Sequence, residues 1–274
     1  MKLIQLTDIH LTSRTSTICG RDPKKNFLKA IDHALANHPN AEALFITGDL
    51  SDYGDREDYL FLRSHIEQLP IPVHLCIGNH DDRNTFKKVF PTLTDEKGFI
   101  QNVIELSAAT ALTLDTLKEN SHAGEFCAQR MSWLKKQLSS IDKKLIIFLH
   151  HHPIKTGVPA TDNIMLEEAD SLLSALQPYK EKITFIFHGH CHMNLSGSIA
   201  GIPFFSPRGT NHASWPNFLE PKFLSTSNLN EVYAIIEFEA DSVTVHPVEF
   251  GYSGPIKTDG IIDYQVFKDG KTRN

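Results

Sequence analysis

Short runs of apolar residues alternate along the chain with longer stretches in which apolar residues recur every three or four positions. The short runs predict buried strands, and the longer stretches predict amphipathic helices. The predicted strands are residues 1–7, 43–47, 73–77, 145–149 and 183–187, and the predicted helices are residues 26–36, 57–68, 125–138 and about 166–176. This alternation favours an α/β fold with a largely parallel sheet and helices outside it.

The pattern changes after about residue 197, where strand-like stretches follow one another without helices between them. Residues 232–238 and 243–248 predict a hairpin that turns at Ala240 and Asp241. A linker rich in Pro, Gly or Ser is not found between the two parts. We therefore expect a single domain over residues 1–274, with a strand-rich C-terminal part from about residue 197.

The composition is that of an ordinary globular protein, with 41% hydrophobic and 22% charged residues in 274 positions. A chain of this length can bury a sizeable core without disulfides. It carries 27 Lys and Arg against 33 Asp and Glu, a formal net charge of −6. This balance disfavours the broad basic surface of a general nucleic-acid-binding protein, so no stable nucleic-acid partner is expected.

Membrane and secretory signals are weak in this sequence. Its apolar runs are shorter than the roughly 18 residues of a membrane span, and the apolar start runs directly into Asp8 and His10, unlike a signal peptide. The cysteines form no CxxC pair, which indicates reduced thiols. We therefore expect a cytoplasmic protein without a membrane partner.

Polar side chains follow all five predicted strands at the point where each strand ends. The groups are Asp8 and His10, residues 48–52, residues 78–81, residues 150–153 and residues 188–192. Ligand sites in open α/β folds lie beyond the carboxyl ends of strands, so these groups are expected to meet. Imidazoles and carboxylates together suit Zn, Mn, Fe or Co. A bridging carboxylate can hold two such ions roughly 3.5–4 Å apart, as in phosphoester hydrolysis.

The order and spacing of these motifs across residues 8–192 resemble the calcineurin-like metallophosphoesterase superfamily. The matching motifs are Asp8-x-His10, Gly48-Asp49-x-x-Asp52, Gly78-Asn79-His80-Asp81, His150-x-x-Pro153 and Gly189-His190-x-His192. Residues 48–54, 69–73, 201–203 and 209–212 are similar to the class III cyclic-nucleotide phosphodiesterase and glycerophosphodiesterase branch, which extends the resemblance to about residue 250. The resemblance implies an αββα sandwich of two mixed sheets flanked by helices.

The resemblance also implies a role for each motif residue. It implies that Asp8, His10 and His192 hold one metal, that Asn79, His150 and His190 hold a second, and that Asp49 bridges them. A hydroxide bridging the metals would be the nucleophile. His80 would protonate the leaving oxygen or stabilise its charge, and Asp81 would orient His80. We further expect His212 to contact the substrate, and His151 either to contact it or to support a ligand.

The implied activity is metal-dependent hydrolysis of small phosphodiesters, such as 3′,5′-cyclic nucleotides or glycerophosphodiesters. Mn²⁺ or Fe²⁺ are the expected ions, and Zn²⁺ or Co²⁺ also suit the donors. The alternatives are a nucleotide-linked pyrophosphate hydrolase, a phosphomonoesterase and a nuclease. A binding scaffold without catalysis is disfavoured because every implied ligand position is filled. Asp52 stands where purple acid phosphatases have tyrosine, which argues against that type of centre.

The walls of the site are expected to come from loops, such as residues 155–162 and 211–223. Trp215 and Phe218 in the second loop either stack on a base of the substrate or pack against the core or a partner, and packing is the commoner role of such aromatics. Relatives that resemble this branch often form dimers or larger assemblies. A homo-oligomer, in the simplest case a dimer, is therefore expected.

Overall fold

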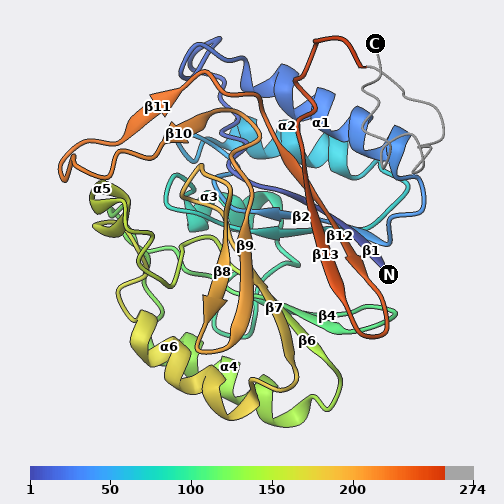
Figure 1. Cartoon of the computed structure of the whole chain (residues 1–274), viewed down its shortest axis with the longest axis vertical. Helices are drawn as coiled ribbons and strands as arrows, with labels where there is room; N and C mark the ends of the chain where they lie inside the picture. Colours follow the sequence, from blue (N-terminus) through green and yellow to red (C-terminus); the bar gives the residue numbers. More distant parts are fainter. Residues whose placement is uncertain (257–274) are drawn as a thin grey trace, which may run out of the picture.

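Two large mixed sheets face each other between layers of helices in the computed structural model of the chain, which describes residues 1–256 (Figure 1). The first sheet has the order β13 (Val243–Val248), β12 (Tyr233–Phe238), β1 (Lys2–Leu6), β2 (Ala43–Thr47) and β3 (Val73–Cys76). The second has the order β4 (Asn102–Glu105), β5 (Thr110–Thr113), β6 (Leu145–Phe148), β7 (Ile183–Phe187), β9 (Ile202–Ser206) and β8 (Leu195–Ile199). The expected αββα sandwich is confirmed.

Parallel strands form one side of the first sheet, up to the edge strand β3, and the centre of the second sheet. β1, β2 and β3 run parallel, as do β5, β6, β7 and β9, whereas β12, β13, β4 and β8 are antiparallel to their neighbours. The predicted hairpin at residues 232–248 is β12 and β13. Beyond the two sheets, β10 (Ala213–Trp215) and β11 (Ser225–Ser227) form a separate two-stranded ribbon.

Helices cover the outer face of each sheet. α1 (Pro23–Asn37), α2 (Arg56–Ile66) and α3 (Arg83–Val89) pack on the first sheet, and α4 (Ala128–Ser140) and α6 (Ala169–Leu176) pack on the second. The short helix α5 (Pro159–Asp162) lies in the loop between β6 and α6, and a 3₁₀ turn (Gln177–Tyr179) extends α6.

Local sequence signals explain where the first helix begins. Asp22 caps α1 by accepting a hydrogen bond from the Lys25 backbone at 3.0 Å, and Pro23 stands in the first turn, where its missing N–H costs nothing. Phe27, Ala30 and their neighbours one turn further on are buried, as their spacing predicts.

Aromatic side chains fill the layer between the sheets. Phe45 of β2 stacks on Phe148 of β6 with ring centroids 3.9 Å apart, and Phe148 stacks in turn on Phe187 of β7. This contact brings the two groups of parallel strands together, so their carboxyl ends lie at one edge of the sandwich.

The predicted elements are present, with additions. β4, β5, α3 and α5 were not predicted, since runs of four to seven residues are too short to show a period. α6 begins at Ala169 rather than at about residue 166. The single domain stays a prediction. Within residues 1–256, the structure contains no helix with the length and apolarity required to cross a membrane.

A buried ion network fixes the loop that follows β5. Asp115 is fully buried and accepts hydrogen bonds from Arg83 at 2.8 and 2.9 Å, while Arg130, also buried, lies 3.5 Å from it. Both arginines also donate to the backbone oxygen of Leu117. The network therefore ties α3 and α4 to one loop.

We predict that Asp115→Ala lowers the free energy of unfolding by about 3–5 kcal/mol, since it removes the buried carboxylate that neutralises two largely buried guanidinium groups. Urea denaturation monitored by circular dichroism measures the change. The control is Glu119→Ala, because Glu119 is the exposed partner of Arg83. This substitution should lower the free energy of unfolding by less than about 1 kcal/mol. Equal losses in the two variants would contradict a special role for the buried carboxylate.

Candidate metal centre

The loops after β1, β2, β6 and β7 meet at the carboxyl edge of the sandwich. Backbone hydrogen bonds join the first two loops, from Asp8 to Gly48 at 3.1 Å and from His10 to Asp49 at 2.9 Å. The two sheets are joined at the same place, because the His190 backbone donates to both carboxylate oxygens of Asp8 at 3.1 Å. The convergence expected from the sequence is therefore present.

The first group of side chains consists of Asp8, His10, Asp49 and His192. All are buried, and one potential ligand atom from each lies within 4.8 Å of the others. His192 Nε2 is 3.2 Å from Asp8 Oδ1 and 3.2 Å from His10 Nε2. His10 Nε2 is 3.7 Å from Asp49 Oδ2. Two carboxylates and two imidazoles thus converge on one point.

A second group lies on the other side of Asp49. His150 Nε2 is 3.3 Å from Asp49 Oδ2 and 3.2 Å from Asn79 Oδ1. His150 and His190 also have ligand atoms within 4.8 Å of each other and of His151. Asp49 therefore stands between the two groups: its Oδ2 atom lies near His10 of the first group and near His150 of the second.

The backbone at these positions is unusual in a way that fits metal binding. Eight non-glycine residues among those described have positive φ, and five of them belong to these groups, listed here: Asp8, His10, Asp49, His190 and His192. Such backbone is uncommon outside glycine and costs of order 1–3 kcal/mol per residue. Strain concentrated on a set of imidazole and carboxylate donors indicates a functional site that takes divalent cations.

Gly78 shows how tightly the second group is packed. A Cβ atom at this position would collide with Asp49 Oδ1 and with His150 Nε2. Only glycine therefore lets the backbone before Asn79 pass behind these two side chains.

The charges of the two groups balance one another. Burial disfavours ionised Asp49, but the neighbouring histidines His150, His80 and His10 together outweigh this and hold the pKa of Asp49 well below its usual range. Burial lowers the pKa of His190 well below its usual range, so this imidazole is neutral. A neutral imidazole and an ionised carboxylate are the protonation states that bind metal ions.

His80 lies at the rim of the first group. Its Nδ1 is 3.0 Å from the Asp52 backbone oxygen, and its backbone donates to Asp49 Oδ1 at 2.9 Å. The Asp52 side chain is 2.8 Å from His10 Nδ1 and 3.6 Å from His80 Nδ1. Burial would lower the pKa of His80, but the charges of Asp49 and Asp52 and the hydrogen bond to Asp52 raise it above the usual range.

Asp81 does not make the contact expected from the sequence. Its hydrogen bonds in the structure come from the backbones of Gly78, Leu50 and Ser51 at 2.8–3.1 Å and from the Tyr59 hydroxyl at 2.9 Å, rather than from His80. The carboxylate turns back beneath the loop because these donors surround it. The expectation that Asp81 orients His80 is therefore corrected: Asp81 ties together the loops after β2 and β3, and Asp52 is the carboxylate near His80.

The two residues expected to bind substrate lie in different surroundings. His212 is partly exposed, and its ring lies 4.2 Å from that of His192 and 4.9 Å from that of His10. His151 is fully buried, and its Nδ1 is 2.8 Å from the Thr116 hydroxyl. His212 therefore lines the cavity, whereas the His151 ring lies 4.6 Å from that of His190 and does not line it.

Sequence reasoning missed His122. Its Nδ1 is 3.0 Å from the amide nitrogen of Asn79, and its ring lies 5.6 Å from that of His80. The contact leaves the Asn79 oxygen facing His150. His122 follows no predicted strand, so the strand-end rule could not find it; the polar run of residues 119–122 was the available signal.

One cavity of about 550 Å³ opens onto both groups. Its floor includes His10, Asp49, Asn79 and His80. Its walls include residues 160–161, 163–164, 222–224 and 226. Of the loops expected to form the walls, residues 155–162 contribute Ala160 and Thr161, and residues 211–223 contribute His212, Ser214, Lys222 and Phe223. A cavity of this size suits a small-molecule ligand.

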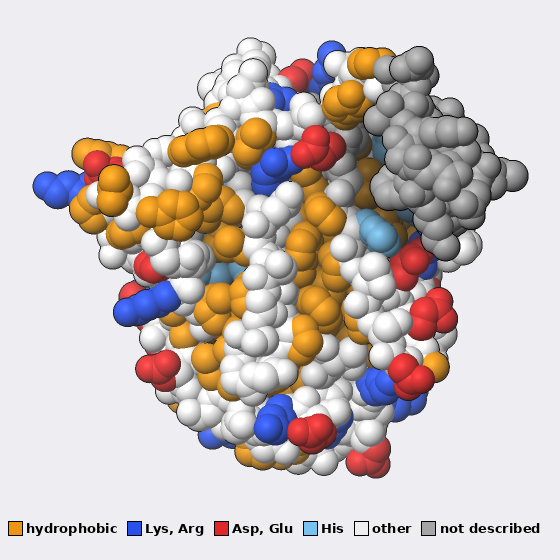
Figure 2. All heavy atoms as spheres, viewed as in Figure 1, with side chains coloured by type: hydrophobic (Ala, Val, Ile, Leu, Met, Phe, Trp, Pro, Cys, Tyr) orange, Lys and Arg blue, Asp and Glu red, His pale blue; other side chains and the backbone are white. Residues whose placement is uncertain are grey.

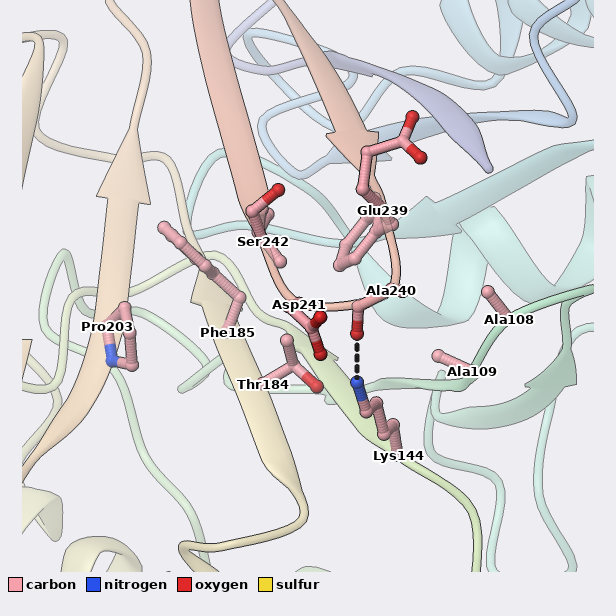
Figure 3. Close-up of a pocket in the computed structure, with 12 residues that line it drawn as sticks. Ala108, Ala109, Lys144, Thr184, Phe185, Pro203, Glu239, Ala240, Asp241 and Ser242 are labelled. Carbon is pink, nitrogen blue, oxygen red and sulfur yellow. Dashed lines mark hydrogen bonds between the residues drawn. The ribbon is translucent and has the colours of Figure 1, made fainter.

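A second hollow, of about 680 Å³, lies near the opposite ends of the strands (Figure 3). It is lined by Phe185, Pro203 and the turn between β12 and β13, and its one lysine, Lys144, already donates to the Ala240 oxygen at 3.0 Å. Its lining includes no histidine. The titratable groups suited to chemistry therefore gather in the first cavity.

Comparison with known proteins agrees with this geometry. A probable cyclic nucleotide phosphodiesterase of Rhodopseudomonas palustris is 35% identical over 93% of this chain and 95% of its own length. A probable glycerophosphodiester phosphodiesterase of Arcobacter nitrofigilis is 28% identical over 70% of this chain and 72% of its own length. These names agree with the prediction of a phosphodiester hydrolase.

Solved structures support the fold. A purple acid phosphatase from yellow lupin (Lupinus luteus) seeds has a TM-score of 0.65 and 13% identity, over 92% of this chain and 52% of that one. The model of the calcineurin-like phosphoesterase family matches residues 1–194 and so contains all of the converging motifs. This chain therefore belongs to the calcineurin-like phosphoesterase family.

Proposed function

We propose that this protein hydrolyses small phosphodiesters with the help of two divalent metal ions. Mn²⁺ and Fe²⁺ are the preferred candidates for these ions. The observation that carries the proposal is the buried pair of donor groups on either side of Asp49, at the floor of one cavity. The relatives named for cyclic nucleotides and for glycerophosphodiesters support a diester as the substrate.

In this proposal each ion has its own ligands and Asp49 serves both. The first ion is held by Asp8, His10 and His192, and the second by Asn79, His150 and His190. Bound divalent ions supply charge neutralisation at the phosphate and lower the pKa of bound water. Asp52 holds His10 by its Nδ1, which fixes the ring and leaves Nε2 facing the carboxylates.

His80 acts on the leaving group. Its raised pKa keeps a larger fraction of the imidazole protonated near neutral pH, so it can give a proton to the departing alkoxide oxygen. His212 faces the same space and contacts the substrate. His122 holds the Asn79 amide so that its oxygen stays directed toward His150.

We place this activity in the cytoplasm. Support comes from four free cysteines (Cys19, Cys76, Cys127 and Cys191), a pattern that suits a reducing compartment. The homo-oligomer expected from the sequence stays a prediction, which light scattering of the purified protein will decide.

We predict that metal-stripped protein reloaded with Mn²⁺ cleaves bis(p-nitrophenyl) phosphate faster than p-nitrophenyl phosphate, and that chelator abolishes both reactions. Asp49→Ala should lower diester turnover by more than about 100-fold, because the charge neutralisation is worth several kcal/mol. Hydrolysis assays with metal analysis measure both effects. The control is Asp142→Ala, which removes an exposed carboxylate near the start of β6.

Other outcomes of this panel separate the alternatives. Cleavage of the monoester alone would make the protein a phosphomonoesterase. Cleavage of nucleotide-linked pyrophosphates or of single-stranded DNA in preference to small diesters would identify the other two activities. Two bound metals per chain in Asp49→Ala would contradict the bridging role. The absence of hydrolysis of every substrate by the metal-loaded wild type would contradict the proposal.

We predict that His80→Ala lowers turnover of diesters with alkoxide leaving groups by about 100- to 10,000-fold. The loss should be much smaller for bis(p-nitrophenyl) phosphate, because p-nitrophenolate leaves without a proton. Steady-state kinetics on glycerophosphoethanolamine and on the nitrophenyl diester measure the difference, with exposed His246 as the control position (His246→Ala). Equal losses on the two substrates would exclude proton donation by His80.

We predict that affinity for Mn²⁺ rises between about pH 6 and pH 9 and that binding releases protons. Burial would lower the pKa of His150, but Asp49 raises it to about 9, and Asp8 raises that of His192 in the same way. Each imidazole must therefore lose its proton to bind an ion. Calorimetry in buffers of different ionisation enthalpy measures the release. An affinity that stays constant over this range would contradict the ligand assignment.

A further inference from the structure

The polar floor of the metal-site cavity faces an apolar wall that the metal chemistry does not use. Five of the lining residues have aliphatic or aromatic side chains and are not among the donor residues, namely Ile18, Ala160, Ile164, Phe223 and Leu224. Two of them, Phe223 and Leu224, belong to residues 213–227, which comprise β10, β11 and the turn between them and are called the arm below.

The arm is anchored beside the donor groups and reaches across the cavity. Its first strand is attached where Ser214 donates to the backbone oxygen of His192 at 2.9 Å. Its turn is attached to the segment after α5, where the Asn163 amide donates to the Pro221 oxygen at 2.9 Å. Figure 1 shows the arm extending toward α5. Together the arm and the α5 segment enclose one side of the cavity.

The arm carries large apolar side chains that are not buried within the fold. Phe223 is 70% exposed and Leu224 is 53% exposed, although both line the cavity. Figure 2 shows apolar side chains gathered over this part of the molecule. Large apolar side chains kept at a cavity rim are typical of a ligand-binding wall.

Polar groups are interspersed with this apolar wall. Thr161, Asn163, Ser214 and Thr226 line the same cavity and offer hydroxyl and amide groups, and Lys222 adds one cation. A flat group with apolar faces and a polar edge, such as a nucleobase, matches such a wall. A glycerol or ethanolamine ester has no face to stack, and an acyl chain would require a wall without polar groups.

We infer that the arm forms a nucleobase subsite, in which Phe223 stacks on the base of a nucleotide diester whose phosphate lies on the metal site. The inference deepens the proposed phosphodiesterase function and rests on it. It makes Phe223 a specificity-determining residue that favours nucleotide diesters over glycerophosphodiesters. Trp215 and Phe218, the aromatics considered for stacking from the sequence, are not among the residues that line the cavity.

The kinetic test compares two substrates and three variants of the Mn²⁺-loaded enzyme. Phe223→Ala should lower kcat/KM for 3′,5′-cyclic AMP about tenfold, mainly through KM, and leave glycerophosphoethanolamine within about twofold. Phe223→Trp should restore the value for cyclic AMP. The matched control is Phe218→Ala, because Phe218 is 62% exposed on the same arm but does not line the cavity. Equal losses on both substrates, or the same loss in Phe218→Ala, would overturn the inference.

A binding measurement separates failure of the subsite from failure of the proposed activity. Calorimetry with metal-loaded protein compares 5′-AMP with ribose 5-phosphate, which lacks the base. The wild type should bind 5′-AMP about tenfold more tightly, and Phe223→Ala should remove this difference without weakening ribose 5-phosphate. Equal binding of the two ligands by the wild type would overturn the base subsite, whether or not any diester is hydrolysed.

Discussion

Two carboxylates are buried where the two sheets meet, and the rest of the site is arranged around their charge. An unpaired buried carboxylate is too costly for a marginally stable fold. Here Asp8 lies 3.2 Å from His192, and Asp49 lies 3.3 Å from His150. These two carboxylates follow strands of one sheet, and His192 and His150 follow strands of the other, so these two charge pairs form only when the sheets pack together. Cation binding in place of the imidazole protons is therefore linked to the packing of the sandwich.

The same constraint accounts for the strained backbone. Left-handed conformations at five donor residues each cost free energy and persist only where surrounding contacts determine them. The contacts are visible here: the loops after β1 and β2 bond to each other through Asp8 and His10, and the His190 backbone bonds to Asp8. The aromatic layer around Phe45 and Phe148 holds the strands that present these loops. Packing in the core thus holds the loops at the carboxyl edge of the sandwich in backbone conformations that they would otherwise leave.

The sequence pattern predicted the α/β elements and the converging donors because both depend on short-range patterns, whereas the sandwich arrangement was implied by the family resemblance. A strand that ends in a ligand is an apolar run followed abruptly by polar residues, and neighbouring parallel strands must end at one edge. Side-chain direction is different, since it depends on the local turn. Asp81 is adjacent to His80 in sequence, yet its carboxylate turns back to Gly78 and to the loop after β2. His122 follows no strand, and its loop is held through Asp115 by Arg83 and Arg130, which are distant in sequence, so the strand-end pattern could not place it.

The division between floor and walls bears on which diester is cleaved. In the proposed function the floor binds the phosphate, and every diester has one, so the floor would not distinguish a nucleotide from a glycerol ester. Relatives named for these two substrates both match this chain over most of its length. The difference in substrate must therefore come from the walls, which here are the arm and the segment after α5. These walls are loops carried by a rigid scaffold, so their side chains can change without disturbing the donors. That separation is why an aromatic residue on the arm can decide the substrate while the strand ends decide the chemistry.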